Sequence, residues 1–395
     1  SPAHASDLFA ELVCSNSLRS DRLQNAVGLL KEEMRRLDSL VIRAADQARV
    51  PAGGALAVDR DQFSGFITKE LLSHPLLTFT PGEVTEFPAR DTIIATGPLT
   101  SEAFSETIQS LPQVGVLHFY DAAAPIVTRE SIDMTRAFKA SRYGRGDDDY
   151  INCPMDEAEY RAFYDALLTA QTAPVHGFEE SRVFEGCMPV ESLARRGDMA
   201  LAFGPLKPVG LTNPHTGRRP YAVLQLRRDD ASDSLYNLVG FQTRLMFPEQ
   251  RRVFGMIPGL EQAEFARYGV MHRNTFLNSP GLLDNQYMMK GSDGVYFAGQ
   301  MTGVEGYVES AASGLQAGLS LANRLLGRQQ VTFPSATGMG ALARYVSTHN
   351  RNFQPMHVSF GLIDPLPERV RGKEQRYLKV AERALALIDN IAQAN

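Results

Sequence analysis

The fold is decided by one stretch of sequence, Val295-Tyr296-Phe297-Ala298-Gly299-Gln300, and by the glycine-rich turn that follows it. The stretch predicts a short buried strand that ends at a glycine. Residues 308–326 then predict a helix whose small residues share one face and pack on the sheet. These small residues are Ala311, Ala312, Gly314, Ala317 and Gly318. A second strand, predicted over residues 91–97, also ends at a glycine, which is typical of doubly wound α/β folds.

This order of strand, turn and helix favours a flavin site over a turn that binds no ligand. Glycines allow the backbone to pass close to a ligand. The amino end of the helix supplies free N–H groups and a positive dipole, which would stabilise the negative charge of a reduced flavin. We therefore predict that FAD is bound by the residues at both strand ends and in the turn: Thr96, Gly97, Gly299, Gln300, Gly303, Gly306 and Tyr307. Tyr307 either covers the flavin or is a packing residue.

The 395-residue chain is long enough for two domains, and its texture changes after residue 97. Residues 98–286 contain more proline, more aromatic residues and hairpin-like stretches such as 221–226. We predict an α/β protein with a Rossmann-like FAD-binding domain of the glutathione-reductase type, formed by residues 1–97 and 287–395. An α+β domain for substrate and RNA, residues 98–286, is inserted into it. Helices are expected over residues 18–49 and 61–73, and short strands over 77–80 and 84–87.

Composition limits the possible functions. No run of eighteen apolar residues exists, so no membrane span is predicted. The net charge of -5 excludes a uniformly basic nucleic-acid binder but permits a local basic face. Of the 40 basic residues only 7 are lysine, and the arginines suit either RNA recognition or a compositional bias. The three cysteines form no disulfide framework and no metal-ligand spacing, which predicts a cytoplasmic protein with reduced thiols and no metal.

Several further segments resemble the TrmFO (Gid) family of folate- and FAD-dependent tRNA uracil-5-methyltransferases. They are residues 11–19, 120–125, 184–189, 203–211 and 271–276, besides the glycine-rich segment above. The resemblance implies methylation of C5 of a uridine in the tRNA T-loop. Methylenetetrahydrofolate would supply the carbon, reduced FAD would carry the methylene and reduce it, and NADH or NADPH would reduce the flavin again. No stable protein partner is expected.

Two cysteines suit this chemistry. A thiolate that adds to uracil C6 makes C5 nucleophilic, and a base must later remove the C5 proton. The resemblance points to Cys14 and Cys187 as the reactive pair. Cys14 is expected at the start of a helix over residues 16–40, whose dipole favours thiolate, and Cys187 lies in a turn-like setting. We predict Cys14 as nucleophile and Cys187 in proton removal, with the reverse assignment and a purely structural role as alternatives. Cys153 is predicted to be structural.

Other polar residues are candidates for substrate contacts. Lys207 lies between two prolines and either holds a phosphate or uracil oxygen or is a solvated loop residue. His272, Arg273 and Asn274 form a polar group suited to folate or nucleotide, or a structural one. Arg60 is either cofactor-facing or stabilising, and the acidic run 147–149 is predicted to be a solvated loop.

No G-x-G-x-x-G turn, the usual pyrophosphate-binding element of such folds, is found in the sequence. In the family this unit lies upstream of the position corresponding to Ser1, so we expect this polypeptide alone to bind FAD weakly or fold poorly. The alternatives to the tRNA enzyme are a methyltransferase acting on ribosomal RNA, a flavin-dependent thiol oxidoreductase using Cys14 and Cys187, and an inactive truncated homologue that binds RNA.

Overall fold

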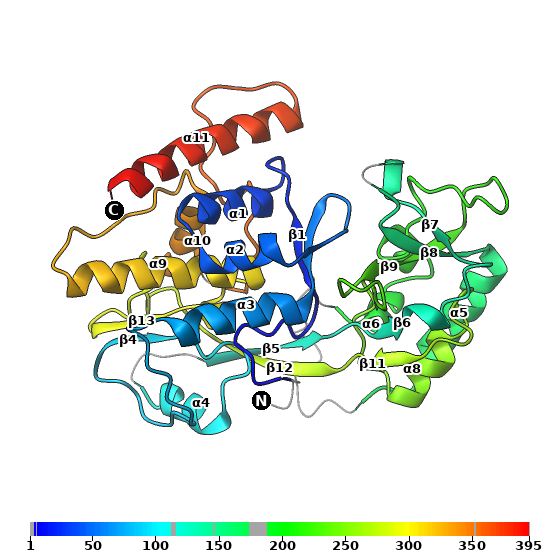
Figure 1. The fold of residues 1–395 in the computed structure, drawn as a ribbon, viewed down its shortest axis with the longest axis horizontal. Helices are drawn as coiled ribbons and strands as arrows, with labels where there is room; N and C mark the ends of the chain where they lie inside the picture. The colour runs from blue at the N-terminus through cyan, green and yellow to red at the C-terminus, as the bar shows by residue number, and fades with distance from the viewer. Residues whose placement is uncertain are drawn as a thin grey trace.

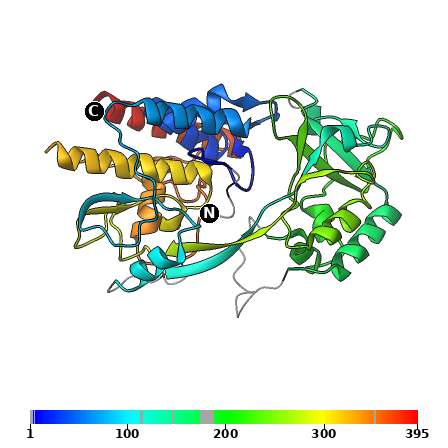
Figure 2. The ribbon, with the colours of Figure 1, turned by 60° about the horizontal axis from the view of Figure 1, so that its bottom comes forward.

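The computed structural model describes residues 4, 6–111, 116–144, 147–173, 188–350 and 353–394. The chain forms two lobes that are joined by a long antiparallel pair of strands, β5 (Val116–Ala122) and β12 (Met271–Leu277) (Figures 1 and 2). The first lobe contains both ends of the described chain, and the second contains its middle.

The first lobe combines helices with two small sheets. β4 (Arg90–Ile94) pairs in parallel with β13 (Asp293–Phe297). A three-stranded antiparallel sheet has the order β1-β3-β2, with β1 Ser17–Ser20, β2 Arg49–Val50 and β3 Ala55–Val58. The helices are α1 (Ala26–Arg36), α2 (Leu40–Gln47), α3 (Arg60–Ser73), α4 (Glu102–Gln109), α9 (Tyr307–Leu325), α10 (Gly338–Ser347) and α11 (Lys373–Ala394), with a 3-10 turn η5 (Gln300–Thr302) before α9.

The second lobe is built on a six-stranded antiparallel sheet in the order β11-β6-β10-β9-β8-β7. Its strands are β6 (Ile126–Thr128), β7 (Phe138–Lys139), β8 (Tyr150–Met155), β9 (Ala222–Arg228), β10 (Leu235–Leu238) and β11 (Phe265–Arg267). Its helices are α5 (Glu157–Thr169), α6 (Val190–Ala194), α7 (Ala200–Phe203) and α8 (Phe247–Phe254), with 3-10 turns η1 (Arg129–Ser131) and η2 (Arg142–Gly144).

Each lobe has its own apolar core. The larger core of the first lobe joins residues 12–67 to residues 276–388, whereas the core of the second lobe is made by residues 127–260. A smaller cluster packs Phe104 and Ile108 of α4 against Ile94 of β4 and Val295 of β13, so α4 lies with the parallel strands. In the part of the chain that is described, no helix is both long and apolar enough to cross a bilayer.

Several predicted elements are confirmed. The strands expected over residues 91–97 and 295–300 are β4 and β13, and the helix expected over 308–326 is α9. The helix over 61–73 is α3, which Asp59 caps by accepting a hydrogen bond from the Gln62 N–H. The hairpin-like stretch 221–226 lies in β9, which pairs antiparallel with β10.

The helix predicted over residues 18–49 is wrong in its first part. Residues 17–20 form strand β1, and helix α1 begins only at Ala26. Pairing with β3 overrides the helical periodicity here, and Arg19 has φ 61°, a left-handed conformation that interrupts a helix. Cys14 therefore does not lie at the start of a helix formed by its own segment.

Two other expectations are wrong. Residues 77–80 and 84–87 form no strands, and Phe79 and Val84 are exposed, because no neighbouring strand pairs with them in the described structure. The small face of α9 is only partly packed. Ala312 and Ala317 are buried, but a Cβ added at Gly314 or Gly318 would meet no described atom within 4 Å.

Candidate functional site

The ends of β4 and β13 form the centre of the site. The two strands are parallel neighbours, with Ile94 opposite Phe297, so Thr96 and Gly97 end beside Gly299 and Gln300. The pairing extends to the strand ends, where the Ala298 N–H donates to the Ile94 carbonyl at 2.9 Å. The Gly299 N–H donates to the Ser313 hydroxyl of α9 at 2.7 Å, which fixes the turn against the helix. Parallel strands place ligands at this edge of a sheet.

The four glycines of the site differ in what surrounds them. Gly97 and Gly299 have φ values of 75° and 80°, and within the described structure an added Cβ would meet nothing closer than 4.0 Å. Open space in front of a glycine backbone fits a flat ligand that approaches closely. An added Cβ at Gly303 would instead clash with Phe353, and one at Gly306 would come within 2.5 Å of the Glu309 carboxylate.

Charged residues contact the first turn of α9. The Glu309 carboxylate is fully buried, pairs with Arg19 and accepts a hydrogen bond from the Val358 N–H at 3.0 Å. Burial, and then the charge of Arg19, lower the pKa of His357, which favours the neutral imidazole. The counter-charge of Glu309 is therefore Arg19, with which it forms an ion pair. Gln300 donates to Glu305 at 2.7 Å. Because the cluster occupies the space beside Gly306, it fixes where the helix begins.

Tyr307, the first residue of α9, contacts Cys14 directly. The Cys14 N–H donates to the Tyr307 hydroxyl oxygen at 2.9 Å, and the Cys14 Sγ lies 3.0 Å from the same oxygen. Burial, and then the neighbouring Cys14, raise the pKa of Tyr307 well above its usual range, so the phenol keeps its proton. Its oxygen already accepts from the Cys14 N–H, which leaves that proton free to point at the sulfur. The phenol thus suits a thiolate at Cys14.

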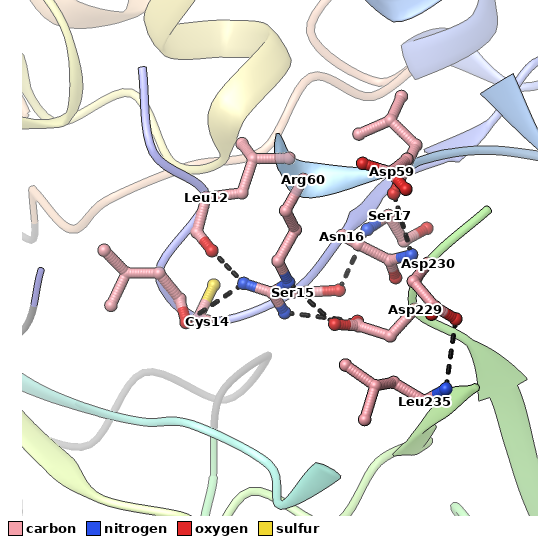
Figure 3. Close-up of polar contacts among 12 residues, drawn as sticks. Leu12, Cys14, Ser15, Asn16, Ser17, Asp59, Arg60, Asp229, Asp230 and Leu235 are labelled. Carbon is pink, nitrogen blue, oxygen red and sulfur yellow. Dashed lines mark hydrogen bonds and ion pairs between the residues drawn. The ribbon is translucent and has the colours of Figure 1, made fainter. Parts of the chain in front are cut away.

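The loop of residues 12–16, here called the Cys14 loop, is held by side chains from both lobes (Figure 3). Arg60 of α3 donates to the carbonyls of Leu12 and Val13 and forms an ion pair with Asp229 at 2.9 Å. The Arg60 side chain therefore holds the Cys14 loop on one side and Asp229 on the other. Asp229 follows β9 of the second lobe, so the ion pair joins the lobes.

The remaining candidates are placed as follows. Cys187 lies outside the described residues. His272, Arg273 and Asn274 lie on β12, opposite residues 121, 120 and 119 of β5, and their side chains lie outside the described structure. Lys207 is exposed in the turn after α7. Cys153 is fully buried in the core of the second lobe, and burial raises the pKa of its thiol.

The acidic run is tied to its surroundings by Asp149, which accepts a hydrogen bond from the Gly53 N–H at 2.6 Å. Among the described residues no group of three potential metal ligands is found.

Sequence reasoning missed Glu309, Arg227 and Asp229. The run Arg227-Arg228-Asp229-Asp230 at the end of an apolar strand was the available signal for the last two, because charges there are seldom buried without a partner. Nothing in the sequence indicated that Arg227 contacts Ser15 and Asn16, more than two hundred positions away, or that Asp229 pairs with Arg60.

The chain resembles proteins of known type along most of its length. Residues 2–329 match the family described as "Glucose inhibited division protein A". The methylenetetrahydrofolate–tRNA-(uracil-5-)-methyltransferase TrmFO of Listeria welshimeri is 58% identical over 393 residues, which are 99% of this chain and 91% of the relative. The protein of the same name from Heliobacterium modesticaldum is 59% identical, over 100% of this chain and 90% of the relative. The structure of Aquifex aeolicus GidA has the same fold, with a TM-score of 0.69 and 14% identity over 96% of this chain and 67% of that one.

Proposed function

The chain belongs to the glucose-inhibited division protein A family, and from this premise we propose that it transfers a one-carbon unit from methylenetetrahydrofolate to C5 of a uridine in tRNA. The observation that carries the proposal is the contact between Cys14 and Tyr307, the first residue of the helix whose Ser313 binds the Gly299 N–H. It supports a thiol suited to attack a uracil near a turn suited to a flavin. The T-loop as target, and the cytoplasm as location, belong to the same proposal.

The residues of this chain carry the nucleotide chemistry. The Cys14 thiolate adds to uracil C6, and the resulting enolate attacks the methylene carbon through C5. A base, for which we propose Cys187, then removes the C5 proton. The bond between the methylene carbon and its carrier then breaks, a hydride adds to that carbon and completes the methyl group, and the resulting enolate expels the thiolate from C6. Tyr307 stabilises the Cys14 thiolate before the attack and after its release.

The flavin would be held by the backbone around Thr96, Gly97, Gly299, Gln300 and Gly303 and by the amino end of α9 at Gly306. Bound FAD supplies the chemistry of a one-carbon carrier and a hydride donor, and NADH or NADPH would reduce it. We assign Lys207, His272, Arg273 and Asn274 to folate and nucleotide binding.

A direct assay tests the proposed function. The protein is incubated with a tRNA transcript, methylenetetrahydrofolate, FAD and NADPH, and 5-methyluridine is measured by nucleoside mass spectrometry. We expect 5-methyluridine with folate and none when it is omitted. A transcript whose T-loop uridines are replaced by cytidine should give no product. Product only with ribosomal RNA would favour that substrate, and thiol oxidation without any product would reject methyl transfer.

The Tyr307→Phe substitution tests the role of the phenol. We expect the rate at which iodoacetamide alkylates Cys14 to fall about tenfold near neutral pH, because a hydrogen bond to a charged group contributes about 1.5–3 kcal/mol. The loss of a donor to the thiolate disfavours the charged form, so the pH profile of alkylation should move to higher pH. Alkylation is quantified on the Cys14 peptide by mass spectrometry. An unchanged profile would contradict the assigned role.

A stack of aromatic rings on the second lobe suits an RNA base. The Tyr268 ring stacks with Phe247, at a centroid distance of 4.5 Å, and with Phe265, at 5.2 Å. The Arg251 guanidinium lies 5.5 Å from the Tyr268 ring centre. Phe247, the first residue of α8, is half exposed, so its outer face is accessible. Aromatic faces beside arginine bind unpaired bases by stacking.

We therefore expect Phe247→Ala to weaken tRNA binding by about 1–3 kcal/mol, the value of one stacked base. Filter binding at a fixed salt concentration measures the dissociation constant. Leu76→Ala, at an exposed apolar residue of the other lobe, is the matched control and should leave affinity unchanged. Equal affinities of the two variants for tRNA would show that the aromatic stack around Tyr268 does not contact the RNA.

A further inference from the structure

The Cys14 loop contains no helix or strand. Besides one backbone hydrogen bond, from the Val58 N–H to the Asn16 carbonyl, several side-chain contacts hold it. On the side of the first lobe, Arg60 Nη1 donates to the carbonyls of Leu12 and Val13, which directly precede Cys14. The Asn16 amide donates to the Val58 carbonyl at 3.0 Å. These contacts hold the backbone on both sides of the thiol.

The second lobe reaches the same loop through the end of β9. Arg227 donates to the Asn16 side-chain oxygen at 3.1 Å and to the Ser15 hydroxyl at 2.9 Å. The Arg228 carbonyl accepts a hydrogen bond from the Asn16 amide at 3.0 Å. Asn16 is fully buried. Its side-chain NH2 group and its side-chain oxygen both take part in the contacts that bridge the lobes.

The ion pair between Arg60 and Asp229 completes the connection. Arg60 Nε lies 2.9 Å and Nη2 3.3 Å from the two oxygens of Asp229, a fork on a carboxylate. The Asp229 side chain is 3% exposed and that of Arg60 14% exposed. A pair this buried contributes little net stability compared with apolar residues of similar size. Its geometry, however, fixes the direction of the third guanidinium nitrogen, which binds the loop carbonyls.

We propose that Arg60 and Asp229 are positioning residues for Cys14, and that the second lobe holds the thiol against Tyr307 through this pair. The inference deepens the proposed function and rests on it for the role of Cys14. A lobe that binds the RNA then also sets the geometry of the nucleophile. Displacing a reacting group by about 1 Å costs on the order of 100-fold in rate, so the effect belongs in kcat and in thiol reactivity. The affinity for tRNA should change little.

The double substitution Arg60→Met with Asp229→Leu separates positioning from stability. It removes both members of the pair together, so neither is left buried without the other, and the melting temperature should remain close to that of the unmodified protein. We expect Cys14 alkylation and kcat to fall about 10–100-fold, with KM for tRNA nearly unchanged. Asp233→Asn is the matched control, because Asp233 contacts Arg228 and Tyr236 of the same hairpin and Lys139 of β7, which all lie outside the Cys14 loop.

The proposal would be overturned by a double variant whose melting temperature and rate of Cys14 alkylation both equal those of the unmodified protein. If the double variant does not fold, the Arg60→Lys variant tests the proposal. Lysine keeps the charge but lacks the planar guanidinium that reaches both Asp229 and the loop carbonyls. We expect about tenfold slower alkylation in that variant, and an unchanged rate would overturn the proposal. Since alkylation is measured without RNA or folate, it tests positioning even if the unmodified chain transfers no methyl group.

Discussion

Replacing Cys14 with alanine should lower the rate of methyl transfer by about 10⁴-fold or more, the loss typical of removing a covalent nucleophile. Without addition of a thiolate at C6, uracil C5 stays too weak a nucleophile to attack the methylene carbon. Cys187→Ala should cost about 10²–10⁴-fold, the usual contribution of a general base. Both rates are measured as 5-methyluridine formed per enzyme, in single-turnover experiments.

A tRNA that contains 5-fluorouridine decides which cysteine is the nucleophile. A base can remove a proton from C5 but not a fluorine, so the reaction stops at the covalent protein–RNA adduct. The adduct is detected as a shifted band on a denaturing gel. We expect the adduct in Cys187→Ala and its absence in Cys14→Ala. The opposite pattern would establish the reverse assignment. Cys153→Ala is the matched control, because Cys153 is buried in the core of the second lobe, and it should form the adduct normally.

Glu309→Gln should lower the free energy of unfolding by about 3 kcal/mol. Glu309 is fully buried and is bonded to Arg19 and to the Val358 N–H, and breaking a buried pair from one side leaves a charge without a counter-charge. The value lies at the low end of the range for such pairs because Arg19 is 35% exposed and keeps part of its hydration. Urea denaturation followed by circular dichroism measures the loss.

Asp293→Asn is the control for this prediction. Asp293 pairs with Arg324, but both side chains are exposed, and exposed pairs contribute less than about 1 kcal/mol. Equal losses in the two variants would show that the Arg19–Glu309 pair has no special role in holding the amino end of α9. A larger loss in Glu309→Gln supports the view that this pair fixes the turn at Gly306.

The strand and helix around Gly299 could be predicted because local sequence alone is enough to specify them. A short apolar run, a turn of glycines and a long amphipathic segment have few other solutions. The stretch 17–20 could not be predicted as a strand, since its periodicity is helical and only pairing with β3 makes it extended. The strand predicted over residues 77–80 is wrong for the converse reason. Their composition suits a strand, but no neighbouring strand pairs with them in the described structure.

Local sequence was enough to specify the family and the strand, turn and helix around Gly299, because each depends on residues that are adjacent in the chain. The assignment of Cys14 and Cys187 as the reactive pair stays a prediction. The surroundings of Cys14, in contrast, follow from the tertiary fold. Tyr307 contacts that thiol from 293 positions away, and Arg227 contacts its loop from more than two hundred positions away. The helix end expected near Cys14 belongs to α9 and not to the segment that follows the cysteine. Contacts between distant segments follow from how the lobes pack, and no local pattern encodes them.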